Sequence, residues 1–252
     1  MLLAAGATLE KTDRDGLTPL LFAAQQGHAS VVEALLDGGA ALAAASLDGS
    51  TALHHASRSG DAATIAELLR RGAAHDTVDH EGMSCLHVAA QNGHAAAAQL
   101  LLSSGASADA IDSYGSTALH LASSKGNAET SEALLRGGAT VDMAGPGGWN
   151  SLHLAAVGGN ADSVRVLLAG GAQVGAVVAS NGATALHMAS RGGAHSVASL
   201  LLDGGASIGA RDRQGNTPAM LAKQQGHEST RELLQSYEDA LSLSKNPSAT
   251  KM

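Results

Sequence analysis

Among the residue types of this 252-residue sequence, histidine has the widest range of possible chemistry, because an imidazole can ligate a metal or transfer a proton. Twelve histidines are present, and five of them recur at a nearly constant interval: His54, His87, His120, His153 and His187. Neighbouring packed helices lie roughly 8–10 Å apart, whereas zinc ligands must each lie about 2 Å from one shared ion. Histidines on successive helices cannot share a metal. We therefore interpret this series, the ladder histidines, as structural: each imidazole is expected to bond near its own helix start and to the next repeat.

The other reactive residue types form no catalytic set. Cys85 and His87 are two residues apart in a predicted helix, so their side chains do not face each other. The glycine-rich stretch 145–148 lacks the strand and lysine of a phosphate-binding loop. Acidic residues such as Glu33 and Glu67 scatter over predicted helices, as on a solvated face. We predict no catalytic residue, no cofactor, no metal and no enzymatic activity.

The ladder histidines belong to a longer block that repeats along the chain. Thr51–Ala56 reads TALHHA, Ser84–Ala89 reads SCLHVA and Thr117–Ala122 reads TALHLA. The interval is 84 − 51 = 33 residues, and the single exception is 184 − 150 = 34. A fixed period in this range indicates a solenoid built from stacked supersecondary units.

Each repeat has the same predicted parts. A turn of the form Asp-x-x-Gly, as in Asp112–Gly115, comes first, since Asp and Gly favour turns. A threonine such as Thr18 can then cap a helix, and Pro19 suits its first position. This short helix ends at a glycine, and a second helix with apolar residues at helical spacing follows. A pair of small residues such as Gly38–Gly39 ends the second helix.

This pattern resembles the ankyrin repeat. The likeness lies in the Asp-x-x-Gly turn, the Thr-(Pro/Ala)-Leu-His-x-Ala block, the glycine in mid-repeat and the Leu-Leu-x-x-Gly-Ala close. The resemblance implies an all-α repeat fold, an ankyrin-type α-solenoid of antiparallel helix pairs with β-turn fingers. It also implies that the first helices and the fingers line a concave groove.

The predicted array spans residues 1–240 and contains seven full repeats after half a repeat. Since the half repeat leaves the first full repeat partly uncovered, we expect either an excerpt of a longer repeat protein or a partner at that end. Polar residues in the last repeat suit a terminal cap, and we expect the final residues to be disordered. The predicted boundaries are 1–12 (half repeat), 13–45, 46–78, 79–111, 112–144, 145–178, 179–211, 212–240 and 241–252 (tail).

Composition narrows the classes of partner. The formal net charge of −8 argues against non-specific nucleic-acid binding. No stretch is long and apolar enough to suggest a membrane span. The single cysteine, Cys85, excludes an internal disulfide framework and suits a reducing compartment. We expect a monomeric protein in the cytoplasm or nucleus, with another protein or peptide as its partner.

Recognition is expected at positions that vary from copy to copy while the frame stays constant. These are the turn tips, the residue after the turn glycine and the end of the first helix. By the resemblance, ankyrin arrays bind partners there. Aromatic, methionine and basic residues at these positions are the candidates: Arg14, Arg58, His80, Met83, Tyr114, Lys125, Trp149, Arg191 and Arg213.

Two features of these candidates shape the hypothesis. Trp149 and Tyr114 are of the types that dominate interface energetics, although Trp149 could equally fill space beside Gly147 and Gly148. Basic residues at first-helix ends favour an acidic or neutral peptide. We predict a protein–protein interaction scaffold. The alternatives are a regulatory region of a larger enzyme, channel or ubiquitin-ligase adaptor, and a structural spacer.

Overall fold

The structure is a computed structural model that describes residues 8–245. Contacts between residues divide this part of the chain into two units. Unit 1 comprises residues 8–122 and 129–140, and unit 2 comprises residues 123–128 and 141–245. Helix α7 (Ala118–Lys125) contributes residues to both units.

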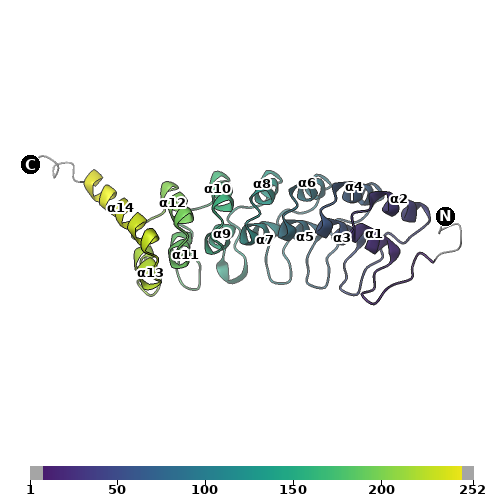
Figure 1. Ribbon diagram of the computed structural model, residues 1–252, viewed down its shortest axis with the longest axis horizontal. Helices are drawn as coiled ribbons and strands as arrows, with labels where there is room; N and C mark the ends of the chain where they lie inside the picture. Colours follow the sequence, from purple (N-terminus) through teal and green to yellow (C-terminus); the bar gives the residue numbers. More distant parts are fainter. Residues whose placement is uncertain (1–7, 246–252) are drawn as a thin grey trace, which may run out of the picture. The chain divides into compact units, whose positions relative to one another are not determined.

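Within unit 1 the helices form two rows (Figure 1). The first helices of successive repeats pack side by side, α1 on α3 and α3 on α5, and the second helices do the same. The loops before the first helices project as fingers beside their row. Apart from α7, the helices are α1 (Pro19–Gln25), α2 (Ala29–Asp37), α3 (Ala52–Ser59), α4 (Ala62–Arg70), α5 (Cys85–Asn92), α6 (Ala95–Ser103) and α8 (Ala128–Arg136).

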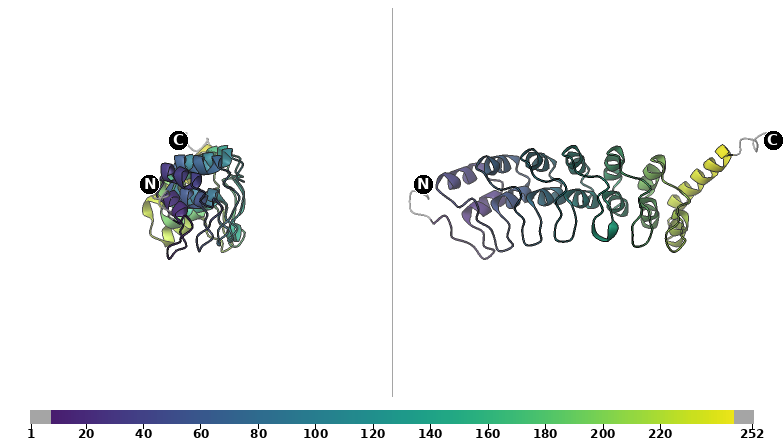
Figure 2. Two further views of the ribbon diagram at one scale, coloured as in Figure 1. Left: turned by 90° about the vertical axis from the view of Figure 1, so that its right-hand side faces the viewer. Right: turned by 180° about the vertical axis from the view of Figure 1, so that it is seen from behind.

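Unit 2 repeats this arrangement (Figure 2). Helix α11 packs between α9 and α13, and α12 packs between α10 and α14. The finger of repeat five includes a short 3-10 helix, η2 (Pro146–Gly148). The other elements are α9 (Ser151–Val157), α10 (Ala161–Ala169), α11 (Ala185–Gly192), α12 (His195–Asp203), α13 (Pro218–Gln224) and α14 (Glu228–Lys245).

The predicted all-α repeat fold is confirmed. Residues 8–245 contain seven helix pairs, one for each full repeat inferred from the sequence. Within the same range, β-pairing is limited to isolated bridges at the bases of fingers, such as Ala45 with Thr51 and Val177 with Thr184.

A thin leucine layer holds each helix pair together. The first helix contributes one leucine per repeat and the second helix contributes another, which explains how so few aromatic residues suffice. Residues that fill this layer at no more than 1% exposure include Leu20, Leu53, Leu68, Leu86, Leu101, Leu119, Leu134, Leu152, Leu167 and Leu186. Full burial of a leucine stabilises by about 1.5–3 kcal/mol, so stacking rather than a central core supplies the stability.

The C-terminal end of the array differs from the expectation. Helix α14 runs through Lys245, so residues 241–245 are helical rather than part of a disordered tail. Tyr237 and Glu238 stand where Gly38–Gly39 follow α2, and without those glycines the helix continues. Residues 246–252 of the predicted tail lie outside the described residues.

Most of the predicted half repeat, residues 1–7, also lies outside the described part. Residues 8–12 form no helix. Glu10 nevertheless accepts a hydrogen bond from the backbone of Ala41 at 2.9 Å, as Asp109 does from Thr140 at 2.8 Å. Residues 8–12 thus contact the next repeat as the close of a full repeat does.

Both the backbone conformation and the closeness of neighbouring atoms require glycine at mid-repeat. Gly60 ends α3 with φ +76°, the left-handed region that favours glycine. A Cβ at this position would lie 2.4 Å from Nδ1 of His94, whose Nε2 bonds the carbonyl of Arg58 at 3.1 Å. Gly72 has φ +86°, but a Cβ there would meet nothing within 4 Å. Gly60 therefore carries a spatial constraint that Gly72 lacks.

We predict that Gly60→Ala destabilises the protein more than Gly72→Ala. Both variants place alanine in the left-handed region, at roughly 1–2 kcal/mol each, but only Gly60→Ala also displaces His94 from its bond, at about 1 kcal/mol. Urea unfolding of the two variants and the parent measures the difference. Equal losses would show that the His94 contact contributes nothing.

Candidate functional site

Within each unit, ladder histidines connect one repeat to the next. His54 contacts the Thr51 hydroxyl through Nδ1 at 2.9 Å and the carbonyl of Met83, in the next finger, through Nε2 at 3.1 Å. His87 makes the same pair of contacts to Ser84 and Ser116, at 2.8 and 3.0 Å. In unit 2, His187 reaches Thr184 at 2.9 Å and Asn216 at 3.1 Å. The structural interpretation of the ladder is confirmed in both units.

These contacts determine which ring nitrogen carries the proton. The backbone N–H of Thr51 donates to Nδ1 of His54 at 3.2 Å, so Nδ1 must present a lone pair. The carbonyl of Met83 can only accept, so Nε2 must carry the proton. We infer a neutral Nε2–H imidazole. Burial supports this, because it lowers the pKa values of His54, His87 and His153.

The ladder also starts the helices. In repeats two, three, five and six, the histidine occupies the third helical position and completes a capping box with the residue before the helix. A glutamate or glutamine usually has this role. Leu21 and Met220 stand at this position in the first and last repeats, where the threonine hydroxyl alone accepts, at 3.4 and 3.3 Å. The sequence predicted a bond near the helix start, and the structure shows that this bond completes a reciprocal capping box.

The fingers are further tied to one another by backbone bonds. The N–H of Leu47 donates to the carbonyl of Asp15 at 3.1 Å, and that of His80 to Asp48 at 2.9 Å. In unit 2, the N–H of Arg213 donates to Asn181 at 2.8 Å. An aspartate such as Asp112 accepts from two backbone N–H groups inside its own turn, at 2.9 and 2.8 Å. The fingers are therefore hydrogen-bonded platforms that present their tip side chains.

The finger of repeat six contains the extra residue. Val178 N–H bonds the carbonyl of Ala183, five residues on, where Asp13 N–H bonds that of Leu17, four residues on. His153 of the preceding repeat bonds the carbonyl of Ala176 at 3.0 Å. The inserted residue therefore lies within the turn 178–183, and the histidine contact moves to the base of the finger.

Most of the predicted recognition residues are exposed, although not equally. Tyr114 is 68% exposed at a finger tip, whereas Met83 is only 8% exposed and offers a partner little side-chain surface. Trp149 is half-buried: its ring meets His153 edge-on at 6.1 Å and lies over Gly147, so it fills space and remains partly accessible. The other candidates are exposed: Arg14, Arg58, His80, Lys125, Arg191 and Arg213.

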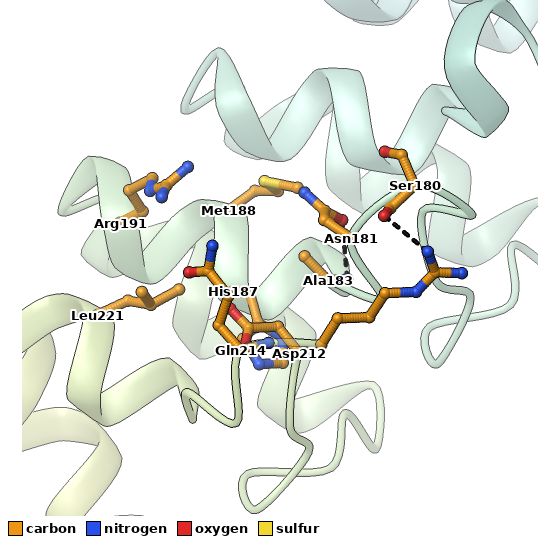
Figure 3. A pocket seen from close by; sticks show the side chains of 10 residues that line it. Ser180, Asn181, Ala183, His187, Met188, Arg191, Asp212, Gln214 and Leu221 are labelled. Carbon is orange, nitrogen blue, oxygen red and sulfur yellow. Dashed lines mark hydrogen bonds between the residues drawn. The ribbon is translucent and has the colours of Figure 1, made fainter.

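Two of these residues line the same cavity of unit 2. Arg191 at the end of α11 and Arg213 on the last finger line a space of about 290 Å³. Figure 3 shows the side chains of Asn181, Gln214 and Met188 around the same space. Asn181 and Gln214 lie at finger tips and were not among the candidates chosen from the sequence.

An equivalent cavity lies in unit 1. It has a volume of about 310 Å³, and Arg58 lines it together with Asp15, Asp48 and His55. Burial raises the pKa of the Asp48 carboxyl, but hydrogen bonds from Ser46 and Ser50 outweigh this effect and lower that pKa to about 2. Neither cavity includes Arg14, His80, Tyr114 or Trp149, which lie elsewhere on the fingers.

Comparison with known proteins decides the family. A family model described as ankyrin repeats in three copies matches residues 1–79, 60–144, 86–178 and 152–243. The chain belongs to the ankyrin repeat family. The crystal structure of the human ASB11 ankyrin repeat domain is similar, with a TM-score of 0.79 and 29% sequence identity over 88% of this chain and 98% of that chain. The search of curated proteins found no match.

Ankyrin repeats generally mediate protein–protein interaction. Two reactive side chains of this ankyrin array can be described by their surroundings. Burial raises the pKa of the Cys85 thiol to about 12, so the thiolate is not available at neutral pH. The Ser46 hydroxyl donates to Asp48 at 2.6 Å while His55 Nε2 lies 3.1 Å away. The carboxylate thus holds the serine rather than the histidine, unlike a catalytic triad.

No helix within residues 8–245 of the ankyrin array is long and apolar enough to cross a bilayer.

His55 makes the stability of the ankyrin array sensitive to acid. Burial and the nearby charge of Arg58 lower the pKa of His55 to about 4 from an ordinary value near 6.5. The unfolded chain therefore binds the proton more readily than the folded protein between these values. Stability is fully present above pH 6.5 and is lost as the pH falls towards 4.

We predict that His55→Leu loses less stability than the parent between pH 7 and pH 4.5. Leucine stands at the equivalent position in Leu121 and Leu154, so the repeat accommodates it. Urea midpoints at both pH values measure the effect, with the exposed His28→Leu as the control. If His55→Leu and the parent lose the same stability on acidification, His55 is not the source.

Proposed function

We propose that the finger tips and first-helix ends of each unit, here called the finger surface, bind a partner polypeptide, and that the protein is a non-enzymatic scaffold. The observation that carries the proposal is that constant and variable positions of the repeat differ in burial. Constant positions such as Leu86 and His87 are buried, and His87 is hydrogen-bonded to the next finger. Variable positions such as Tyr114 and Arg191 are exposed on bonded fingers or helix ends.

Aromatic and basic side chains on this surface suit protein recognition. Tyr114 presents a large ring with a polar hydroxyl at low entropic cost. The ring of Trp149 is held against His153, so little conformational freedom remains to be lost on binding. Interfaces draw most of their affinity from such residues.

The cellular setting is part of the same proposal. The buried, unpaired Cys85 is compatible with a reducing compartment, the cytoplasm or the nucleus. The net charge of −8 supports a protein partner over nucleic acid or an anionic membrane surface. We propose that the protein acts there as a monomer.

We predict that Tyr114→Ala and Trp149→Ala each weaken partner binding, by about tenfold or more if the ring is an interface anchor. The matched control is Arg136→Ala, because Arg136 is exposed at the end of α8 and pairs with Glu132 of the same helix. Affinity capture followed by quantitative mass spectrometry identifies the proteins that the two aromatic variants lose and Arg136→Ala retains. Equal capture by all three variants would contradict the placement of the finger surface.

A further inference from the structure

The cavity of unit 2 lies within the finger surface. Its walls are the finger of repeat six and the finger of repeat seven, and its floor comes from α11 and α13 (Figure 3). The floor side chains Met188 and Leu221 are 6% and 5% exposed, so they form a firm apolar base. The lining residues are Ser180, Asn181, Ala183, His187, Met188, Arg191, Asp212, Arg213, Gln214 and Leu221.

The side-chain acceptors of the amide and carboxylate groups in this cavity are already engaged. Oδ1 of Asn181 accepts from the N–H of Ala183 at 3.0 Å. Oδ1 of Asp212 accepts from the backbone of Gln214 and Asn216 at 2.9 and 2.8 Å, and Oδ2 accepts from Nδ2 of Asn216 at 3.1 Å. Hydrogen bonds from Asn216 hold the pKa of the Asp212 carboxyl below its ordinary value.

The same bonds orient the two amides. Since Oδ1 of Asn181 accepts a backbone N–H, its Nδ2 must be the free end. Nδ2 of Asn216 donates to Asp212, so Oε1 of Gln214, 3.3 Å from that nitrogen, is the accepting end. Both lining amides therefore retain a free NH₂ group.

Hydrogen-bond donors of the cavity lining remain without acceptors. Within the part of the chain that the structure describes, Nδ2 of Asn181, Nε2 of Gln214 and the guanidinium of Arg191 have no hydrogen-bond acceptor. Arg213 uses Nη1 on the carbonyl of Ser180 at 2.9 Å, which fixes its position and leaves its other N–H groups available. A ligand that only accepts hydrogen bonds and carries negative charge matches this lining.

We propose that this cavity binds the side-chain carboxylate of an aspartate or glutamate in the partner polypeptide. The proposal rests on the proposed function and specifies the partner chemistry of unit 2. An ionised carboxylate accepts at both oxygens, and arginine can donate to both at once. Arg191 and Arg213 supply the charge, and the amides of Asn181 and Gln214 add neutral donors.

Unit 1 provides the matched contrast. Arg58 ends α3 as Arg191 ends α11, and each is followed two residues later by a left-handed glycine, Gly60 or Gly193. The unit 2 cavity sets two arginines against the single carboxylate of Asp212, whereas the unit 1 cavity sets Arg58 alone against the carboxylates of Asp15 and Asp48. These repel an acidic ligand, so an arginine at the same repeat position is not expected to bind one there.

The test is a titration with an isolated glutamate side chain. ¹⁵N-labelled full-length protein is titrated with N-acetyl-glutamate methylamide and, separately, with N-acetyl-glutamine methylamide, which differs only in replacing the carboxylate by an amide. We expect saturable shifts of the Asn181 and Gln214 side-chain signals with the glutamate compound only. Arg191→Gln should weaken binding by about tenfold or more, whereas Arg58→Gln should leave it unchanged.

Three results would overturn the proposal. Equal shifts with the glutamine compound would show that charge is not recognised, and equal weakening by Arg58→Gln would show a diffuse electrostatic effect. Displacement by inorganic phosphate at the same concentration as the glutamate compound would show a general anion site. None of these results contradicts the proposed function. That proposal is tested separately by the Tyr114 and Trp149 variants, and it fails if those variants retain every partner.

Discussion

A neutral imidazole that spans two repeats is the interaction on which the rest of this structure depends. In each unit, Nδ1 of the ladder histidine accepts a hydrogen bond from a backbone N–H at the start of its own helix, and Nε2–H donates one to a carbonyl of the next finger. Both backbone groups are required to find partners once buried. A single repeat cannot make the second bond, because the acceptor carbonyl lies in the finger of the following repeat.

The proposed partner-binding positions are those whose side chains are not needed for the stacking of repeats. The tip of a finger contributes backbone bonds to its neighbour, but its side chain has no required partner. Tyr114, for example, donates its own N–H to Asp112 while its ring is exposed. The same repeat position can therefore carry different chemistry in the two units. Arg58 lines a cavity with two carboxylates, whereas Arg191 lines one with a second arginine, one carboxylate and unengaged amide donors.

The frame could be predicted from the sequence because it is periodic. The interval of 33 residues places residues such as Thr51, His54 and Gly60 at equivalent points of successive repeats, and each of these types suits the task it has there. Helix pairs, finger turns and the bonding role of the ladder followed from local rules of capping and turn formation.

Features that depend on a particular neighbour could not be predicted in this way. Met83 occupies a variable position, yet the stacked repeat buries it to 8% exposure. Helix α14 continues because Tyr237 and Glu238 replace a glycine pair, and the hydroxyl of Tyr237 bonds Asp203 of the preceding repeat. The free amide ends of Asn181 and Gln214 emerge only from bonds to other residues of their fingers.

The protonation state of the ladder imidazoles is the central claim, and ¹⁵N NMR of the ring nitrogens at pH 7 measures it directly. For His54, His87 and His187 the account predicts a neutral ring with the proton on Nε2, a lone pair on Nδ1 and slow exchange of the Nε2 proton. A charged ring, or a proton on Nδ1, would contradict it, because neither form can accept from the helix start and donate to the next finger.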